Sequence, residues 1–173
     1  GVGIGTWKGV NTIWNDIQNW CDAIPTAATN VIIPAGKSFY PVIITASPVV
    51  KNITIAPGGS VTITGTGKLG IYGSISNAGI FNVADGTIEM LGSTAQSIPA
   101  AAFQNNDIKN LVISNTAASP GVTLGGALNL YGKLSFTGSN QTFTTAGFLV
   151  LKSTAAGTAS VADITNNSVN SGN

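Results

Sequence analysis

The sequence predicts an all-β fold, specifically a single-stranded right-handed parallel β-helix with a tryptophan-containing cap at its N-terminal end. The chain repeats itself at offsets of 58 and 59 residues, because Lys51–Ile55 returns as Lys109–Ile113 and Leu69–Ile75 returns as Leu128–Leu134. Each copy holds several short segments in which apolar residues alternate with polar ones. Gly, Asn, Ser, Thr and Pro separate these segments. Repeated short strands with a turn after each one are typical of a solenoid, in which stacked strands share one continuous core.

The composition fits one compact domain. The chain has 173 residues, enough to bury about two-thirds of its unfolded surface. Only 8% of the residues are charged, against about 25% in an average protein. Small polar residues take the place of the missing charges, so the sequence lacks the high charge of a disordered chain.

The charge pattern argues against two classes of partner. The seven cationic residues are all Lys, they are dispersed from Lys8 to Lys152, and the net charge is +1. A nucleic-acid site would need clustered cations and Arg, so we expect no nucleic-acid partner. No apolar run approaches the ~18 residues of a membrane span, so we also expect no membrane insertion.

Residues 1–30 are predicted to form the N-terminal cap. The chain's three tryptophans, Trp7, Trp14 and Trp20, all lie here. Large apolar side chains would cover the open end of a stacked core. A short helix or helical turn is also expected, because five residues recur at the spacing of one helical face: Ile13, Ile17, Trp20, Cys21 and Ile24.

Residues 31–163 are predicted to form the turns of the β-helix. Apolar residues at every second position, such as Val61 and Ile63, should point inward, and Ile80 is assigned to this inward set. At about 20 residues per turn we expect six or seven turns, with the repeat (51–79 and 109–138) spanning about three. Segment 94–108 is predicted to be a loop. Residues 164–173 are predicted to be a linker to further domains, since they hold turn residues and little to bury.

Most catalytic sites are excluded by the residues that the chain lacks. Without His there is no Ser-His-Asp or Cys-His site, and with one Cys there is no multi-cysteine metal site. Of the six acidic residues, Asp85 and Glu89 are the closest pair within the strand region. Asp85 lies in a turn and Glu89 at an outward strand position, a poor match to the opposed carboxyl groups of a glycosidase. We therefore expect no enzyme activity, no cofactor and no metal site.

The segment Gly65-Thr66-Gly67-Lys68-Leu69-Gly70 has the letters of a dinucleotide-binding fingerprint. That fingerprint requires a helix after the glycines, to receive the pyrophosphate at its N-terminus. Residues 69–75 alternate like a strand instead. These glycines are better explained as corners between strands that need a positive φ.

Tyr72 and Tyr131 occupy equivalent positions in the two copies of the repeat. If Leu69 and Ile71 point inward, Tyr72 points outward, and the same parity places Tyr131 outside, on what would be the same face. Two aligned exposed rings could stack on a sugar. The alternative is a structural role, shielding the corners beside Gly73 and Gly132.

Cys21 is the single cysteine, so no disulfide forms within the chain. We expect the Cys21 side chain to be buried and to act as a small apolar group in the core. Pairing with a cysteine outside this segment is the alternative.

The chain resembles the β-solenoid segments of large secreted surface proteins of Bacteroidota-type bacteria. The resemblance runs along nearly the whole length and includes Trp7-Lys8-Gly9, Asn19-Trp20, Asn30-Val31-Ile32-Ile33-Pro34, Tyr40-Pro41-Val42-Ile43 and Ser153-Thr154-Ala155-Ala156-Gly157. It implies export, commonly by type IX secretion, and a place in adhesins, including gliding-motility adhesins, or beside the catalytic domains of secreted hydrolases. The family has no agreed catalytic residues, so none are assigned.

The functional expectation is a non-catalytic segment of an extracellular or cell-surface protein that acts as a spacer and display surface. The alternative is a carbohydrate-binding module attached to a secreted polysaccharide-degrading enzyme. The expected partners are flanking domains of a longer chain, and also surface glycans or a partner protein. End-to-end self-association of solenoids is a further expectation.

Overall fold

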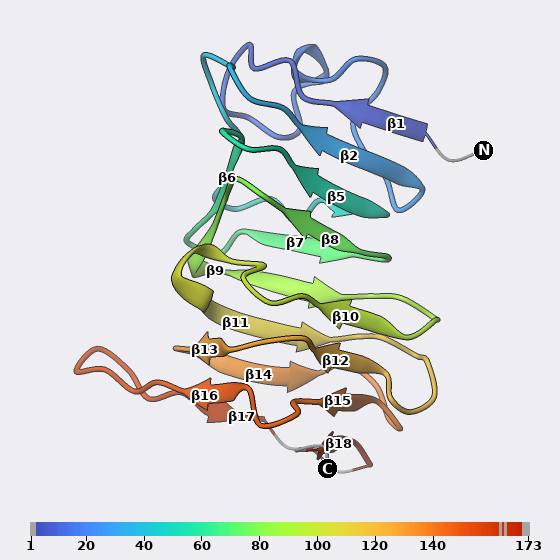
Figure 1. The fold of residues 1–173 in the computed structure, drawn as a ribbon, viewed down its shortest axis with the longest axis vertical. Coiled ribbons are helices and arrows are strands. Elements are labelled where there is room, and N and C mark those ends of the chain that lie inside the picture. Colours follow the sequence, from blue (N-terminus) through green and yellow to red (C-terminus); the bar gives the residue numbers. More distant parts are fainter. Residues whose placement is uncertain (1–2, 163, 165, 171–173) are drawn as a thin grey trace.

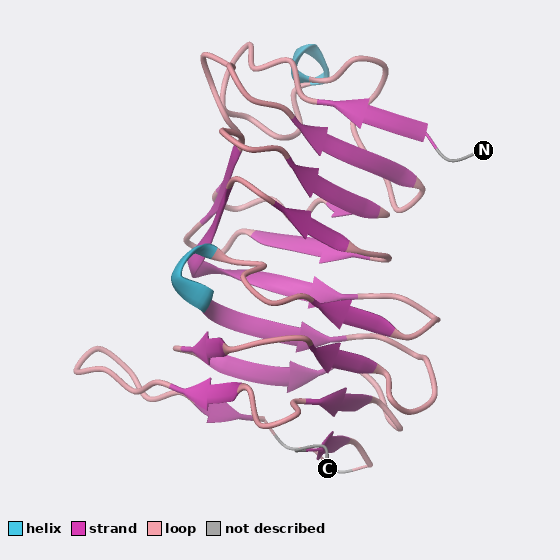
Figure 2. Cartoon of the chain, viewed as in Figure 1, coloured by secondary structure: helices cyan, strands magenta, loops and turns pink. Residues whose placement is uncertain are grey.

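The structure is a computed structural model that describes residues 3–162, 164 and 166–170. The chain winds as a coil of parallel strands stacked along one axis, with the N-terminus at one end (Figures 1 and 2). Within the described residues the only helices are two 3-10 turns, η1 (Ile17–Asn19) and η2 (Gln104–Asn106). The predicted all-β parallel solenoid is confirmed, with about eight turns instead of six or seven.

Each complete turn contributes strands to three faces, which follow one another along the chain. Face 1 contains β1 (Gly3–Thr6), β2 (Thr29–Ile33), β5 (Asn52–Ile55), β8 (Ile75–Asn77), β10 (Gln96–Ile98), β12 (Val122–Leu124), β15 (Thr142–Thr144) and β18 (Ser168–Asn170). Face 2 contains β3 (Val42–Ile43), β6 (Ser60–Ile63), the first part of β9 (Ile80–Met90), the first part of β11 (Asp107–Ile113), β13 (Leu128–Leu130) and β16 (Leu149–Leu151). Face 3 contains β4 (Val49–Val50), β7 (Lys68–Ile71), the second parts of β9 and β11, β14 (Lys133–Phe136) and β17 (Ser160–Val161).

The core consists of columns of aliphatic side chains aligned by the parallel register. On face 3, for example, one column contains four residues from successive turns, Leu69, Ile88, Leu111 and Leu134. All four are fully buried. Burying such side chains contributes about 1.5–3 kcal/mol each, so the column links the turns energetically.

Face 1 is interrupted in the middle of the molecule. Among the described strands, β8 pairs only with β5, and β10 pairs only with β12. The ribbons of β8 and β10 stand further apart in Figure 1 than those of β5 and β8. Faces 2 and 3 remain continuous at this level, because β9 pairs with β11 on both.

The interruption coincides with a change in the corner between faces 3 and 1. Before β8 this corner has three residues (72–74), whereas before β10 it has five (91–95) and before β12 it has eight (114–121). Because these corners are longer, the strands of face 1 from β10 onward start a separate ladder and do not continue the ladder that ends at β8. Face 1 therefore consists of two four-stranded sheets, whereas faces 2 and 3 together form one ten-stranded sheet.

The two copies of the sequence repeat lie one face apart. Residues 49–50 close a turn on face 3 and residues 52–55 open face 1, whereas residues 107–108 lie on face 2 and residues 110–113 on face 3. The repeat is therefore one face short of three full turns. We expected the repeat to span about three turns of about 20 residues each. Most turns are longer than 20 residues, so the repeat ends one face earlier than expected.

Of the helix or helical turn expected in the cap, only the short 3-10 turn η1 forms, and Ile13 and Ile17 are exposed instead of buried. Short polar side chains explain the difference, because they bond to nearby backbone groups and compete with a helix. Asn19 accepts hydrogen bonds from the backbone N–H groups of Val10 and Asn11, and Asp16 accepts one from Gln18.

Three further assignments differ from the sequence prediction. Segment 94–108, expected to be a loop, holds β10, η2 and the start of β11. Within segment 164–173, expected to be a linker, β18 pairs with β15 and continues the solenoid. Ile80 is exposed, because the register aligns Val61 with Phe81 and so makes Phe81 the inward residue.

Candidate functional site

The sequence repeat encodes one type of corner. At the first, the N–H groups of Tyr72 and Gly73 donate to the carbonyl groups of Val50 and Lys51, and the Asn52 side chain accepts from the N–H of Ser74 at 2.7 Å. At the second, Asn110 accepts from the N–H of Lys133 at 2.9 Å in the same way. An Asn in one turn thus caps the Tyr-Gly corner of the next turn.

The two tyrosines lie at different corners of the solenoid. Tyr72 follows β7 and lies between faces 3 and 1, whereas Tyr131 follows β13 and lies between faces 2 and 3. Both rings are accessible, Tyr72 as an exposed residue and Tyr131 as a partly buried one. The expected alignment on one face was wrong, because the repeat is offset by one face. The two tyrosines therefore cannot form one stacking platform.

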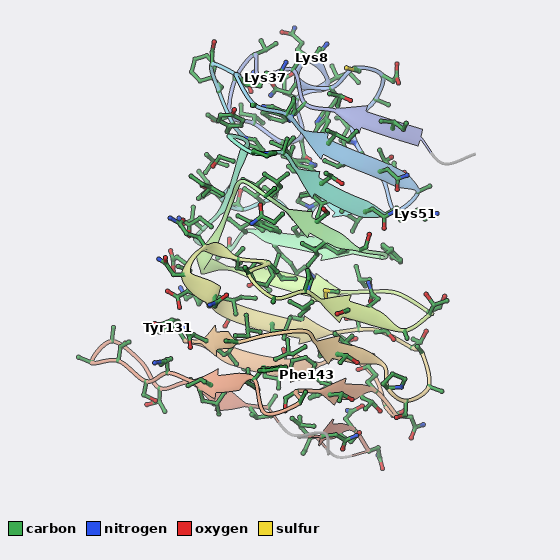
Figure 3. The ribbon with its side chains drawn as sticks, in the orientation of Figure 1. Lys8, Lys37, Lys51, Tyr131 and Phe143 are labelled. Carbon is green, nitrogen blue, oxygen red and sulfur yellow. The ribbon has the colours of Figure 1, made fainter. Side chains whose placement is uncertain are left out.

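Tyr131 lines a shallow cavity of about 420 Å³. The cavity also contains Asp85 and Lys109, and its outer wall is the loop around Thr154–Thr158. Figure 3 shows Tyr131 on the side of the molecule from which this loop projects. An aromatic ring, a carboxylate, an ammonium group and threonine hydroxyls thus meet in one concave surface, while Tyr72 does not line it.

The charges in this cavity are paired. The Lys109 Nζ atom lies 2.5 Å from an Asp85 carboxylate oxygen, and the other oxygen accepts from the Thr64 hydroxyl and the Gly65 N–H. The Lys109 ammonium, and next the Thr64 and Gly65 donors, hold the pKa of Asp85 below its ordinary value. Asp85 is therefore an ionised hydrogen-bond acceptor at neutral pH and a poor general acid.

Glu89 points outward from face 3 but is almost fully buried. Its carboxylate lies 2.5 Å from Lys68 Nζ and accepts a 2.5 Å hydrogen bond from the Ser114 hydroxyl. The sequence prediction had the direction of this side chain right and expected it to be solvated. The neighbouring turns bury it, and the ion pair compensates its charge.

The fingerprint-like glycines do not precede a helix. Lys68 to Ile71 form β7, so the structure offers no helix N-terminus for a phosphate at this place. Gly65 has a positive φ of 62°, as expected for a corner. Gly67 does not, and it is required for space, because a Cβ there would overlap the carbonyl of Ile43.

Sequence reasoning missed Gln96, a buried amide at the interruption of face 1. Its Nε2 donates to the carbonyls of Ile71 and Gly73, and its Oε1 accepts from the Gly92 N–H and the Asn115 side chain. A glutamine inside an alternating strand carries no signal of such a role. Only the long corner before it indicates that the chain path changes here.

Trp7, Trp14 and Trp20 cluster near the N-terminus, as the fold prediction requires. Trp20 packs edge-on against the other two, with ring centroids 4.8 and 5.0 Å away, and all three rings are buried. The indole N–H groups of Trp7 and Trp20 donate to the carbonyls of Phe39 and Trp14. Cys21, expected to be buried, is exposed.

Within the described part of the chain, no group of three or more His, Cys, Asp or Glu side chains is arranged to hold a metal ion. The same residues include no helix with the length and apolar character of a membrane span. The chemistry that the cavity at Tyr131 offers is hydrogen bonding and ring stacking.

Comparison with known protein families gives a match to the N-terminal part of the chain. Residues 6–91 match the family model described as "Domain of unknown function (DUF8693)", which covers just under half of the chain. No curated protein and no solved structure shows significant similarity. The matched region ends directly after β9, at the level where face 1 is interrupted.

Proposed function

We propose that this chain is a non-catalytic β-solenoid segment of an extracellular or cell-surface protein, acting as a spacer and display surface. The observation that supports this proposal best is the single apolar core that runs through the stacked turns, which are joined by a ten-stranded sheet. A quasi-one-dimensional stack holds a fixed distance between its ends and presents outward side chains at regular intervals. The type IX export route and the adhesin context follow from the resemblance of the sequence alone.

The ion pairs of Asp85 and Glu89 favour a non-catalytic role. Asp85 and Glu89 each form an ion pair with a lysine, so neither resembles a carboxyl group poised to protonate a leaving group. Purified protein should release no reducing or unsaturated ends from a panel of polysaccharides. Release that disappears in Asp85→Ala would overturn the proposal.

The location is tested in cells of the source organism. Protease treatment of intact cells should remove an epitope tag placed in the exposed loop at residues 154–158, and a tagged intracellular protein should survive the same treatment. Protection of the tag until the cells are lysed would contradict a surface location.

A second function, glycan binding, is favoured by the cavity at Tyr131. Its aromatic ring stands beside hydrogen-bonding groups, the combination that sugar-binding sites use. A glycan array probed with the purified chain tests this function. Tyr131→Ala should abolish any binding, while Tyr72→Ala, a matched ring at the other corner, should leave it unchanged. Equal loss in both variants would exclude the cavity as the site.

A further inference from the structure

The interruption of face 1 leaves two strand edges that face each other without pairing. In a parallel ladder, alternate residues direct their N–H and C=O groups to the same neighbouring strand. On β8, the groups of Ser74 and Ala78 bond to β5, so by alternation those of Ile75 and Asn77 point toward β10. On β10, Gln96 and Ile98 bond toward β12, so Ser97 points toward β8.

A cavity of about 290 Å³ lies between these edges. Ser74 and Ile75 line one side and Gln96 and Ser97 line the other. The volume is just below the ~300–1,000 Å³ range of ligand pockets. No aromatic ring lines this cavity, in contrast to the cavity at Tyr131.

The side-chain amide of Gln96 closes one end of the gap, and its donors and its acceptor all have hydrogen-bond partners there. Both of its N–H groups donate to backbone carbonyls, and its oxygen accepts two hydrogen bonds. A ligand in the cavity would therefore meet the free backbone groups of Ile75 and Ser97 and the small polar side chains around them. The β8 edge presents the N–H and C=O groups of Ile75 and Asn77, and the β10 edge presents those of Ser97. The next position on the β10 edge, Pro99, has only a C=O group to offer.

We propose that the gap in face 1 is a binding site for an extended peptide segment of a partner protein, which adds as a strand between β8 and β10. An extended backbone is the ligand that matches two opposed strand edges at once, since it offers N–H and C=O groups on both sides. Insertion would restore hydrogen bonding across face 1. This site is separate from the cavity at Tyr131 and does not depend on the proposed function.

The probe is a capped peptide with the sequence of residues 50–56, Val-Lys-Asn-Ile-Thr-Ile-Ala, because β5 belongs to the same face. Titration into the 15N-labelled full chain should shift the amide signals of Ile75, Asn77 and Ser97 in a saturable way. Two N-methylated peptides, blocked at alternate residues, are the controls. Because an inserted strand uses both of its edges, either methylation pattern should weaken binding.

Ser97→Pro and Ser97→Ala form the matched pair of variants. The Ser97 N–H is not part of the ladder with β12, so Pro can be accommodated there while it removes the donor that faces the gap. Ser97→Ala keeps this donor. We expect Ser97→Pro to bind the peptide about tenfold more weakly than Ser97→Ala, with both variants melting near the wild-type temperature.

Three results would overturn the proposal. The first is the absence of shifts at Ile75 and Ser97 with the peptide. The second is equal affinity of the two Ser97 variants or indifference to one methylation pattern. The third is that a neutral oligosaccharide shifts these amides and the peptide does not. If Ser97→Pro fails to fold, the methylated peptides still decide the question on the wild-type chain.

Discussion

At the scale of single residues, Asp85 and Lys109 form an exposed ion pair, and a titration of Asp85 should show its effect on the pKa of that carboxyl group. The pKa of Asp85 is lowered by Lys109 first, and then by Thr64 and Gly65. A lowered pKa in the folded state contributes stability above the unfolded pKa, and this contribution is lost as the pH falls through the folded value. NMR titration of the carboxyl carbon should give a pKa below 3.8, and a higher one in Lys109→Met. An unchanged pKa in the variant would contradict the assignment of Lys109 as the main cause.

Lys68→Met should destabilise the fold more than Lys109→Met does. Lys109 pairs with an exposed carboxylate, and such pairs contribute about 0–1 kcal/mol. Lys68 compensates Glu89, whose side chain is only 11% exposed, so its removal leaves a nearly buried charge with Ser114 as its remaining partner. We expect a loss of roughly 1–3 kcal/mol, measured by urea unfolding. Glu89→Gln in the Lys68→Met background should recover part of it, and no recovery would argue against this account.

The inward or outward direction of most side chains was predictable from the sequence, with Ile80 as an exception, but their position around the solenoid was not. Alternation placed Tyr72, Tyr131 and Glu89 outside, and the structure agrees for all three. The burial of Glu89 and the separation of the tyrosines depend on how many residues each turn contains. That number is set by corner lengths, which period-two patterns do not report.

At the scale of elements, the Tyr-Gly corner should be sensitive to one added methyl group. A Cβ at Gly132 would overlap the Asn110 amide oxygen and crowd the carbonyl of Lys109, although Gly132 does not have a positive φ. Gly132→Ala should therefore cost roughly 1–3 kcal/mol through overpacking. In an Asn110→Ala background the added cost should be smaller, since one of the two obstacles is gone. A double-mutant cycle in urea measures the coupling, and strictly additive losses would contradict the steric explanation.

The elements that the sequence mispredicted share a physical cause. In the cap, apolar spacing predicted a helix or helical turn with a buried face. Only the short turn η1 forms, because Asn11, Asp16 and Asn19 bond to the local backbone and to each other. In segment 94–108, Pro and small residues predicted a loop. The segment nevertheless contains β10, a strand of only three residues that pairs with β12. Short strands gain their stability from neighbouring turns, so local composition underestimates them.

At the scale of the whole molecule, the stack has one continuous core but two separate sheets on face 1. Coupling between the two halves passes through faces 2 and 3, where β9 pairs with β11, and through the packing of Phe81 against Phe103 at 5.2 Å. On face 1, among the described residues, the halves are joined only by side chains, such as Gln96 with its hydrogen bonds to Ile71 and Gly73. In a quasi-one-dimensional protein each turn is stabilised by its neighbours. The interruption is thus the level at which local unfolding of the C-terminal turns is expected to stop.

Phe143→Ala tests this expectation. Phe143 is fully buried in β15, aligned with Val122 of β12, and Figure 3 marks its place in the lower turns. Its removal should cost roughly 3–5 kcal/mol. Hydrogen exchange followed by mass spectrometry should show lost protection in β12, β15 and β16, while β2 and β5 keep wild-type rates.

Phe81→Ala is the matched control, because Phe81 is equally buried but lies beside the interruption. Loss of the same ring there weakens the contacts that join the halves, so exchange should increase on both sides of β9. If Phe143→Ala instead accelerated exchange uniformly from β2 to β16, the stack would unfold as one cooperative unit. The gap in face 1 would then be a local feature of the backbone, with no influence on how the solenoid comes apart.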